Sequence, residues 1–127
     1  MEDTILSDIV ATISPLTTLS VVLENQATKP EFIRVTLVPI SPTRLTTGIT
    51  RIFSHTGIIQ LDMFRKTGQG TDTTTINSII SALNSFQPTG YEIMKVYRVA
   101  NSQAPISQTS GAFISSIRVE YRYFNTI

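Results

Sequence analysis

The sequence GIIQLDMFRKTGQG at residues 57–70 leads directly into TDTTTINSIISALNSF at residues 71–86, and this succession sets the fold class. Apolar and polar residues alternate over residues 57–64, which is the pattern of a β-strand with one more apolar face. The side chains on that face are Ile59, Leu61 and Met63, with Gln60 and Asp62 on the other. The two glycines of residues 66–70 permit a sharp turn after the strand.

The second segment has the periodicity of an amphipathic helix. Its apolar residues recur every three or four positions and form one stripe: Ile76, Ile79, Ile80, Leu83 and Phe86. Thr71 or Asp72 can cap the first turn, while Pro88 and Gly90 end the helix. We therefore expect a helix that packs on a sheet.

Composition limits the function classes. A chain of 127 residues suits one domain. It has no cysteine, which excludes disulfides, thiol nucleophiles and zinc-thiolate sites and favours a cytoplasmic origin. The acidic N-terminus, with polar residues interrupting its apolar ones, is neither a signal peptide nor a membrane-spanning helix. Basic residues are spread singly, so nothing indicates a nucleic-acid interface.

The remaining segments complete an α+β pattern. We predict a helix at residues 4–13 and strands at residues 19–23, 32–38, 49–55, 91–99 and 112–124. Thr56 and Gly57 predict a tight turn that makes residues 49–64 a hairpin. In the strand at 91–99 the alternation places Tyr91, Ile93, Tyr97 and Val99 on one face beside Lys95. In the last strand it separates Phe113, Ile117, Val119, Tyr121 and Tyr123 from Arg118, Glu120 and Arg122.

The order of these elements predicts a single α+β domain over residues 1–127. We expect an antiparallel-rich β-sheet with both α-helices packed on one face. The opposite face of the sheet then remains open.

Residues suited to catalysis are few. His55 is the only histidine, and together with Ser54 and Asp62 it could supply a Ser/His/Asp triad. However, neighbouring residues of a strand point to opposite faces, which separates Ser54 from His55. The carboxylates form no close pair suited to a metal or to glycoside hydrolysis. The glycines at 68 and 70 lack the Lys-Ser/Thr pair of a phosphate loop. We therefore predict no catalytic, cofactor or metal site.

The succession of segments is more informative than any single residue. It comprises an N-terminal helix, VVLEN at 21–25, PEFIRV at 30–35 with Pro39, GIIQLDMF at 57–64, GQG at 68–70 before a helix, and RVEYRY at 118–123. This order resembles the tail terminator proteins of long-tailed bacteriophages, which are minor tail proteins. The likeness covers nearly the whole chain, and residues 102–110 are its least similar part.

The resemblance implies a structural role without enzymatic activity or cofactor. Such proteins form a ring, usually of six copies, on the end of the tail tube distal from the tip. The ring stops tube growth and presents the surface that joins the head. The implied partners are further copies of the chain, the tail tube protein and a head-completion or neck protein, while DNA passes through the ring without sequence-specific binding. The implied location is the virion tail, assembled in the host cytoplasm without a membrane.

The uneven charge suggests where copies could meet. Residues 1–31 carry a net charge of −4, and residues 32–127 carry +5. A heterologous ring needs two different patches on each subunit, although exposed charges can also be merely solvated. Loops at 40–47, 66–72 and 101–111 are candidate contacts or plain connections. The candidate assembly residues are Arg44, Arg65, Lys66, Gln69, Arg118 and Arg122.

Two alternatives stay open at this point. A neighbouring neck protein, such as a tail-completion or head-closure subunit, is also a small ring former. A small oligomeric enzyme or ligand-binding domain would instead use a pocket between helix and sheet. Such a pocket would be lined by His55, Asp62 and Tyr97.

Overall fold

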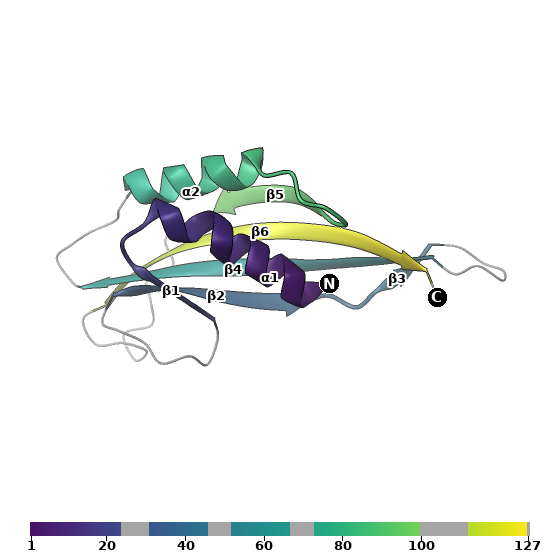
Figure 1. Ribbon diagram of the computed structural model, residues 1–127. Helices are drawn as coiled ribbons and strands as arrows, with labels where there is room; N and C mark the ends of the chain where they lie inside the picture. Colours follow the sequence, from purple (N-terminus) through teal and green to yellow (C-terminus); the bar gives the residue numbers. More distant parts are fainter. Residues whose placement is uncertain (24–30, 46–51, 67–72, 100–111, 127) are drawn as a thin grey trace.

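The structure is a computed structural model that describes residues 1–23, 31–45, 52–66, 73–99 and 112–126 (Figure 1). It confirms the predicted α+β class. The elements in chain order are α1 (Glu2–Ile13), the 3-10 turn η1 (Ser14–Leu16), β1 (Ser20–Leu23), β2 (Phe32–Pro39), β3 (Thr43–Arg44), β4 (Ile52–Lys66), α2 (Thr73–Ser85), β5 (Glu92–Arg98) and β6 (Ala112–Thr126).

The strands form one six-stranded sheet in the order β1-β2-β4-β6-β5, with β3 paired to β4. Only β1 and β2 run parallel among the described strands. The β2–β4, β3–β4, β4–β6 and β5–β6 pairs are antiparallel. The sheet is therefore rich in antiparallel pairs, as predicted.

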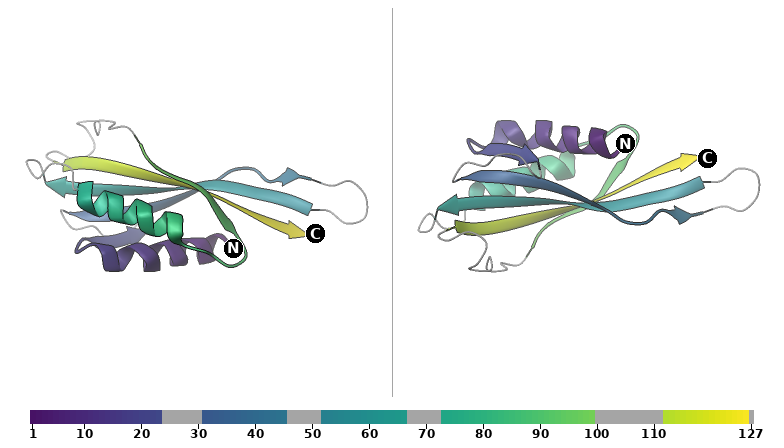
Figure 2. Two further views of the ribbon diagram at one scale, coloured as in Figure 1. Left: turned by 90° about the horizontal axis from the view of Figure 1, so that it is seen from above. Right: turned by 90° about the horizontal axis from the view of Figure 1, so that it is seen from below.

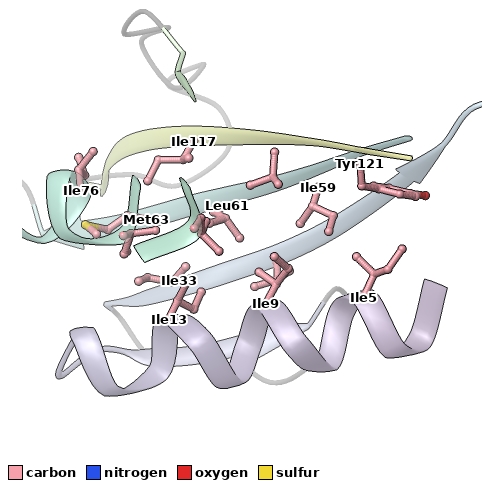
Figure 3. Packing of buried hydrophobic residues seen from close by; sticks show 14 of the residues in the cluster. Ile5, Ile9, Ile13, Ile33, Ile59, Leu61, Met63, Ile76, Ile117 and Tyr121 are labelled. Atoms are coloured by element: carbon pink, nitrogen blue, oxygen red, sulfur yellow. The ribbon is translucent and has the colours of Figure 1, made fainter. Parts of the chain in front are cut away.

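Both helices pack on the same face of this sheet (Figure 2). The buried residues of α1 recur every four positions, at Ile5, Ile9 and Ile13. Those of α2 are Ile76, Ile79 and Leu83, as its periodicity predicts. All six belong to one cluster with the inner face of the sheet (Figure 3). A single core on one side of the sheet follows.

The alternation of apolar and polar residues decides which face of each long strand is buried. Ile59, Leu61 and Met63 of β4 pair with Val119, Ile117 and Ser115 of β6, and all of these are buried. Tyr121 and Tyr123 continue the same face of β6 and are also buried, whereas the side chain of Phe113 lies outside the described ones. The opposite, outer face carries Arg118, Glu120 and Arg122, as predicted, and neither helix covers it (Figure 2).

The predicted hairpin at Thr56 and Gly57 is wrong. Instead, β4 continues through both residues and pairs with β6 along its whole length, from Ile52 to Lys66. Gly57 lies opposite Tyr121, and a Cβ atom at Gly57 would stand 2.3 Å from the Tyr121 hydroxyl oxygen. The glycine is needed because the tyrosine ring occupies the space of a side chain, not because the chain turns.

The predicted facing of β5 is also wrong for Lys95 and Tyr97, which do not share the face of Ile93. Ile93 pairs with Tyr121 and Lys95 with Glu120, so the register shifts between them and Met94 is accommodated as a β-bulge. Beyond the bulge, Val96 faces the core side opposite Val119, and Tyr97 lies on the outer face opposite Arg118.

The segment predicted as a loop at residues 40–47 contains a short strand. Thr43 pairs with Ser54 and Arg44 pairs with Phe53. Residues 46 and 47 lie outside the described residues. The two-residue strand β3 thus prolongs the edge that β2 begins.

The sheet is much longer than its helical cover. At about 3.3 Å per residue, the 15 residues of β4 or β6 span about 50 Å. The 12 residues of α1 span only about 18 Å at about 1.5 Å per residue. One end of the sheet therefore projects beyond both helices (Figure 1). We call this end the blade, and define it as residues 38–45, 52–56 and 122–126.

Candidate functional site

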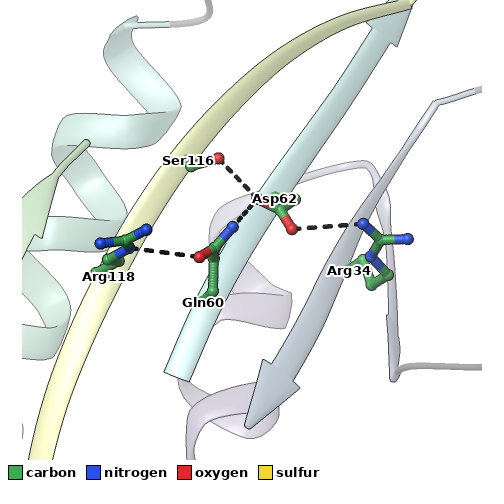
Figure 4. Close-up of polar contacts among 5 residues, drawn as sticks. All are labelled: Arg34, Gln60, Asp62, Ser116 and Arg118. Atoms are coloured by element: carbon green, nitrogen blue, oxygen red, sulfur yellow. Dashed lines mark hydrogen bonds and ion pairs between the residues drawn. The ribbon is translucent and has the colours of Figure 1, made fainter. Parts of the chain in front are cut away.

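The middle of the outer face holds a polar network centred on Asp62 (Figure 4). The Oδ1 atom of Asp62 accepts hydrogen bonds from Ser116 Oγ at 2.6 Å and Gln60 Nε2 at 2.9 Å. Its Oδ2 atom lies 3.6 Å from an Arg34 Nη, and Arg118 Nε donates to Gln60 Oε1 at 3.4 Å. Asp62 is 6% exposed. The buried carboxylate is thus paired and hydrogen-bonded across β2, β4 and β6.

We expect Asp62→Ala to lower the free energy of unfolding by about 1–3 kcal/mol. The substitution removes the carboxylate that accepts the hydrogen bond of the Ser116 hydroxyl and pairs with the Arg34 guanidinium. Denaturant unfolding measures the loss. Glu120→Ala, on the same face and only half-buried, serves as the control and should change stability by less than about 0.5 kcal/mol. Equal losses in the two variants would show that the network adds nothing specific.

The residues considered for a triad do not meet. Asp62 lies on the outer face, whereas His55 lies on the inner face, opposite Tyr123. The His55 ring stacks on Tyr123 with centroids 4.6 Å apart, and its Nε2 lies 2.6 Å from Asn125 Oδ1. Ser54 is on the face opposite to His55. The predicted pocket lined by His55, Asp62 and Tyr97 is therefore not formed. The described residues also contain no cluster of three potential metal ligands.

Two tyrosines tie α1 to the sheet. The Tyr123 hydroxyl donates to Glu2 Oε1 at 2.7 Å, and the Tyr91 hydroxyl donates to Asp8 Oδ2 at 2.8 Å. Burial, with the hydrogen bond to Glu2, raises the pKa of Tyr123 to about 12. Burial likewise raises the pKa of Tyr91. The hydrogen bond from Tyr123 lowers the pKa of the Glu2 carboxyl.

Because of these hydrogen bonds, the free energy of unfolding should decrease at alkaline pH. The pKa of Tyr123 is raised in the folded protein to about 12, above the value of about 10 in an unfolded chain. The unfolded state therefore loses the proton first, and stability that is present below pH 10 is lost as the pH rises towards 12. We expect the free energy of unfolding to fall over this range, and less steeply in Tyr123→Phe. An unchanged slope in that variant, measured by denaturant titration at each pH, would contradict the assignment.

The blade carries exposed apolar side chains on its outer face. Val38 pairs with Ile58, and Phe124 pairs with Ser54, both outer positions of β4. Backbone hydrogen bonds from Ile40 to Thr56 and from Leu45 to Ile52 extend the same pairing. The four apolar residues, which we call the apolar row, are exposed by 52%, 52%, 53% and 51% in the order Val38, Ile40, Leu45 and Phe124.

A hollow of about 520 Å³ lies between α1 and β1. Its walls are apolar, and the exposed Asp3 lies at its rim. We call it the α1–β1 groove. Its lining residues are Asp3, Leu6, Ser7, Val10, Ala11, Val21 and Leu23.

The candidate assembly residues occupy different parts of the sheet. Arg44 is exposed on β3, within the blade. Arg118 and Arg122 lie on the outer face, as predicted, where Arg118 contacts Gln60 and Arg122 forms an ion pair with Glu92. The structure thus brings Arg44 and Arg122 to the blade, while Arg118 belongs to the polar network.

Of the other three candidates, the structure describes two, and both lie away from the blade. Arg65 is near the opposite end of β4, where its Nε is 3.8 Å from Glu31 Oε2. Lys66 is the last residue of β4. Gln69 lies outside the described residues, as do residues 67–72 and 101–111 of the predicted contact loops. Arg65 and Lys66 therefore lie at the end of β4 away from the blade.

Sequence reasoning missed the apolar row. A signal was present, because Val38 continues the face of β2 that carries Arg34 and Thr36, and Phe124 continues the face of β6 that carries Arg118, Glu120 and Arg122. Several exposed apolar residues on one face are more informative than a single one, because only a large contiguous apolar patch marks an interaction site.

Comparisons with known proteins identify a fold and no family. No protein-family model matches the chain, and no curated protein matches its sequence. Several solved structures are similar, and one of them matches with a TM-score of 0.57 and 15% identity over 97% of this chain and 95% of that one. At this identity the likeness concerns the fold alone. None of the described helices has the length and apolar character needed to cross a membrane.

Proposed function

We propose that the chain is a structural subunit of a phage tail, which forms a ring on the head-proximal end of the tail tube and stops tube growth. The ring, of six copies in this proposal, also provides the surface for joining the head. Its partners are the tail tube protein and a head-completion or neck protein. DNA passes through its centre without sequence-specific contacts.

The observation that carries the proposal is the blade. It is a hydrogen-bonded extension of the sheet, because β4 and β6 stay paired along all 15 residues, and its apolar row is more than half exposed. Such a surface suits a protein that binds other proteins. The order of segments along the chain resembles that of tail terminators. For this reason we propose that the proteins it binds are those of a phage tail.

A test in solution uses a tail tube protein of the phage to which this proposal assigns the chain. We expect tubes that polymerise in the presence of the purified chain to be shorter and to carry a ring at one end in negative-stain images. A neck protein would join only to a capped tube and would leave elongation unchanged. Tubes of unchanged length and without rings would therefore contradict the proposal.

A further inference from the structure

We propose that the end of β6 on the blade binds one β-strand of a partner protein, which is not another copy of this chain. The added strand pairs with β6 through backbone hydrogen bonds and continues the line of β5. Within the proposed function the partner is the tail tube protein, so this identification of the partner rests on that function.

The last residues of β6 have a neighbouring strand on one side only. Strand β4 pairs with β6 up to Thr126, whereas β5 pairs with it only up to Arg122. Beyond that point β6 continues past the start of β5 (Figure 1). Residues 123–126 therefore form an open edge of the sheet, which we call the β6 edge.

The backbone groups of two residues point out of the β6 edge. The amide of Val99 donates to the carbonyl of Ser116 at 3.0 Å, so the even-numbered residues of β6 turn their N–H and C=O groups towards β5. The register of β6 with β4 has no shift along its length, and Phe124 and Thr126 keep this orientation. Among the described residues, no backbone hydrogen bond reaches either of them on this side. An added strand thus finds two donors and two acceptors.

The other edges of the sheet carry features that discourage strand addition. Strand β5 has a bulge and the charged residues Glu92, Lys95 and Arg98, and β1 is only four residues long. On the far side of the blade, Pro39 ends β2 and Pro42 precedes β3, and proline has no N–H to donate. The β6 edge contains neither a proline nor a charged residue.

This difference between the edges decides which partner the β6 edge fits. A ring of copies joins two unlike surfaces of each subunit, and each other edge that a copy could offer is protected. Two β6 edges could pair with each other only about a two-fold axis, which joins two copies and no more. The strand is therefore supplied by a different protein.

The surroundings of the β6 edge specify the side chains of the added strand. A residue opposite Phe124 points to the outer face, where the Phe124 ring is 51% exposed and an aromatic or β-branched side chain packs well against it. The next residues along the added strand point to the helix side, where the exposed Asn125 lies. The partner segment is therefore extended, with apolar and polar residues in alternation.

A hollow of about 390 Å³ lies at the inner end of the β6 edge and can receive one further side chain. Pockets beside an open edge give selectivity to strand addition, while the backbone bonds give affinity. The two charged side chains of the hollow, Glu92 and Arg122, form an ion pair with each other, so an uncharged side chain fits best. The lining residues are Gly90, Tyr91, Glu92, Arg122, Tyr123 and Phe124.

Hydrogen exchange tests the β6 edge at single amides. In the free chain we expect the amides of Tyr123 and Asn125, which face β4, to exchange about tenfold or more slower than those of Phe124 and Thr126. Adding the tail tube protein should slow the latter two by about tenfold or more. Binding that leaves these two amides unchanged would overturn the inference. Protection that rises with the concentration of the chain alone would instead assign the edge to a second copy and overturn the choice of partner.

Two substitutions at one position separate the backbone from the side chain. Phe124→Ala removes the ring and keeps the N–H, whereas Phe124→Pro removes both. Because this N–H points away from β4, both variants keep the pairing of β6 with β4, which denaturant unfolding checks. We expect Phe124→Pro to bind the tail tube protein about tenfold or more weaker than Phe124→Ala, which corresponds to about 1.4 kcal/mol. Equal affinities would contradict strand addition. Thr126→Ala and Thr126→Pro repeat the comparison if Phe124→Pro fails to fold.

The failure of this inference can be told apart from the failure of the proposed function. Tubes capped by Phe124→Pro as well as by the intact chain would refute the added strand and leave termination standing. Protection of Phe124 and Thr126 by the tail tube protein, together with tubes of unchanged length, would establish the added strand and refute termination. A chain that does not bind the tail tube protein at all would refute both.

Discussion

Gly57→Ala is expected to destabilise the protein by about 3 kcal/mol or more, which is the upper range for inserting a methyl group into a packed core. The new Cβ would lie 2.3 Å from Oη, 2.5 Å from Cζ and 2.6 Å from Cε2 of Tyr121. The ring has little room to move, because Tyr121 is 1% exposed and stacks with Tyr123 at a centroid distance of 6.4 Å. Denaturant unfolding should show a lower midpoint with an unchanged slope.

A double-mutant cycle identifies the cause of that loss. In a Tyr121→Leu background the side chain opposite residue 57 is shorter, so adding Gly57→Ala should cost much less. Thr56→Ala, the neighbouring residue on the outer face, is the matched control and should cost little. If Gly57→Ala costs the same in both backgrounds, the backbone and not the tyrosine ring requires the glycine.

The second large effect is expected from truncation of α1. Ile9→Ala should lower the free energy of unfolding by about 2–5 kcal/mol, because it removes buried contacts and leaves a cavity. Ile9 is 0% exposed and belongs to the cluster shared by both helices and the sheet. A domain of this size has a total stability of about 5–15 kcal/mol. The variant should therefore lose a large fraction of its stability in denaturant unfolding.

Leu6→Ala provides the comparison on the same helix. Leu6 is only partly buried and lines the α1–β1 groove. Its truncation should cost clearly less stability than Ile9→Ala. A loss of stability as large as that of Ile9→Ala would place Leu6 in the core.

The alternation of residues was sufficient to predict the faces of the long strands. Ile59, Leu61 and Met63 are buried as expected, and Arg118 and Arg122 lie on the outer face. The spacing of Ile76, Ile79 and Leu83 likewise predicts the buried side of α2. These predictions hold because burial on one face imposes a period that can be read locally.

The wrong predictions concern features that depend on distant partners. Thr56 and Gly57 have the composition of a turn, but Gly57 is fixed by Tyr121, far along the chain. The bulge at Met94 reverses the facing of Tyr97 and has no signal in the sequence of β5. The tyrosine bonds that hold α1 join residues 83 and 121 positions apart.

The candidate surfaces were only partly predictable for the same reason. Arg44 and Arg122 were expected at assembly contacts and lie on the blade. The α1–β1 groove was not foreseen, because it forms only when α1 and β1 are placed side by side. The apolar row brings together residues from β2, β6 and the segments before and after β3, and pairing with β4 is what aligns them.

The most direct test of the proposed function is the length of the tail tubes made by the phage to which that proposal assigns the chain. When its gene is removed and infected cells are lysed, we expect negative-stain images to show tubes of variable, excessive length that are not joined to heads. Supplying the intact chain should restore a uniform length. Tails of normal length without the chain would contradict the account, and normal-length tails without heads would assign the chain to the neck.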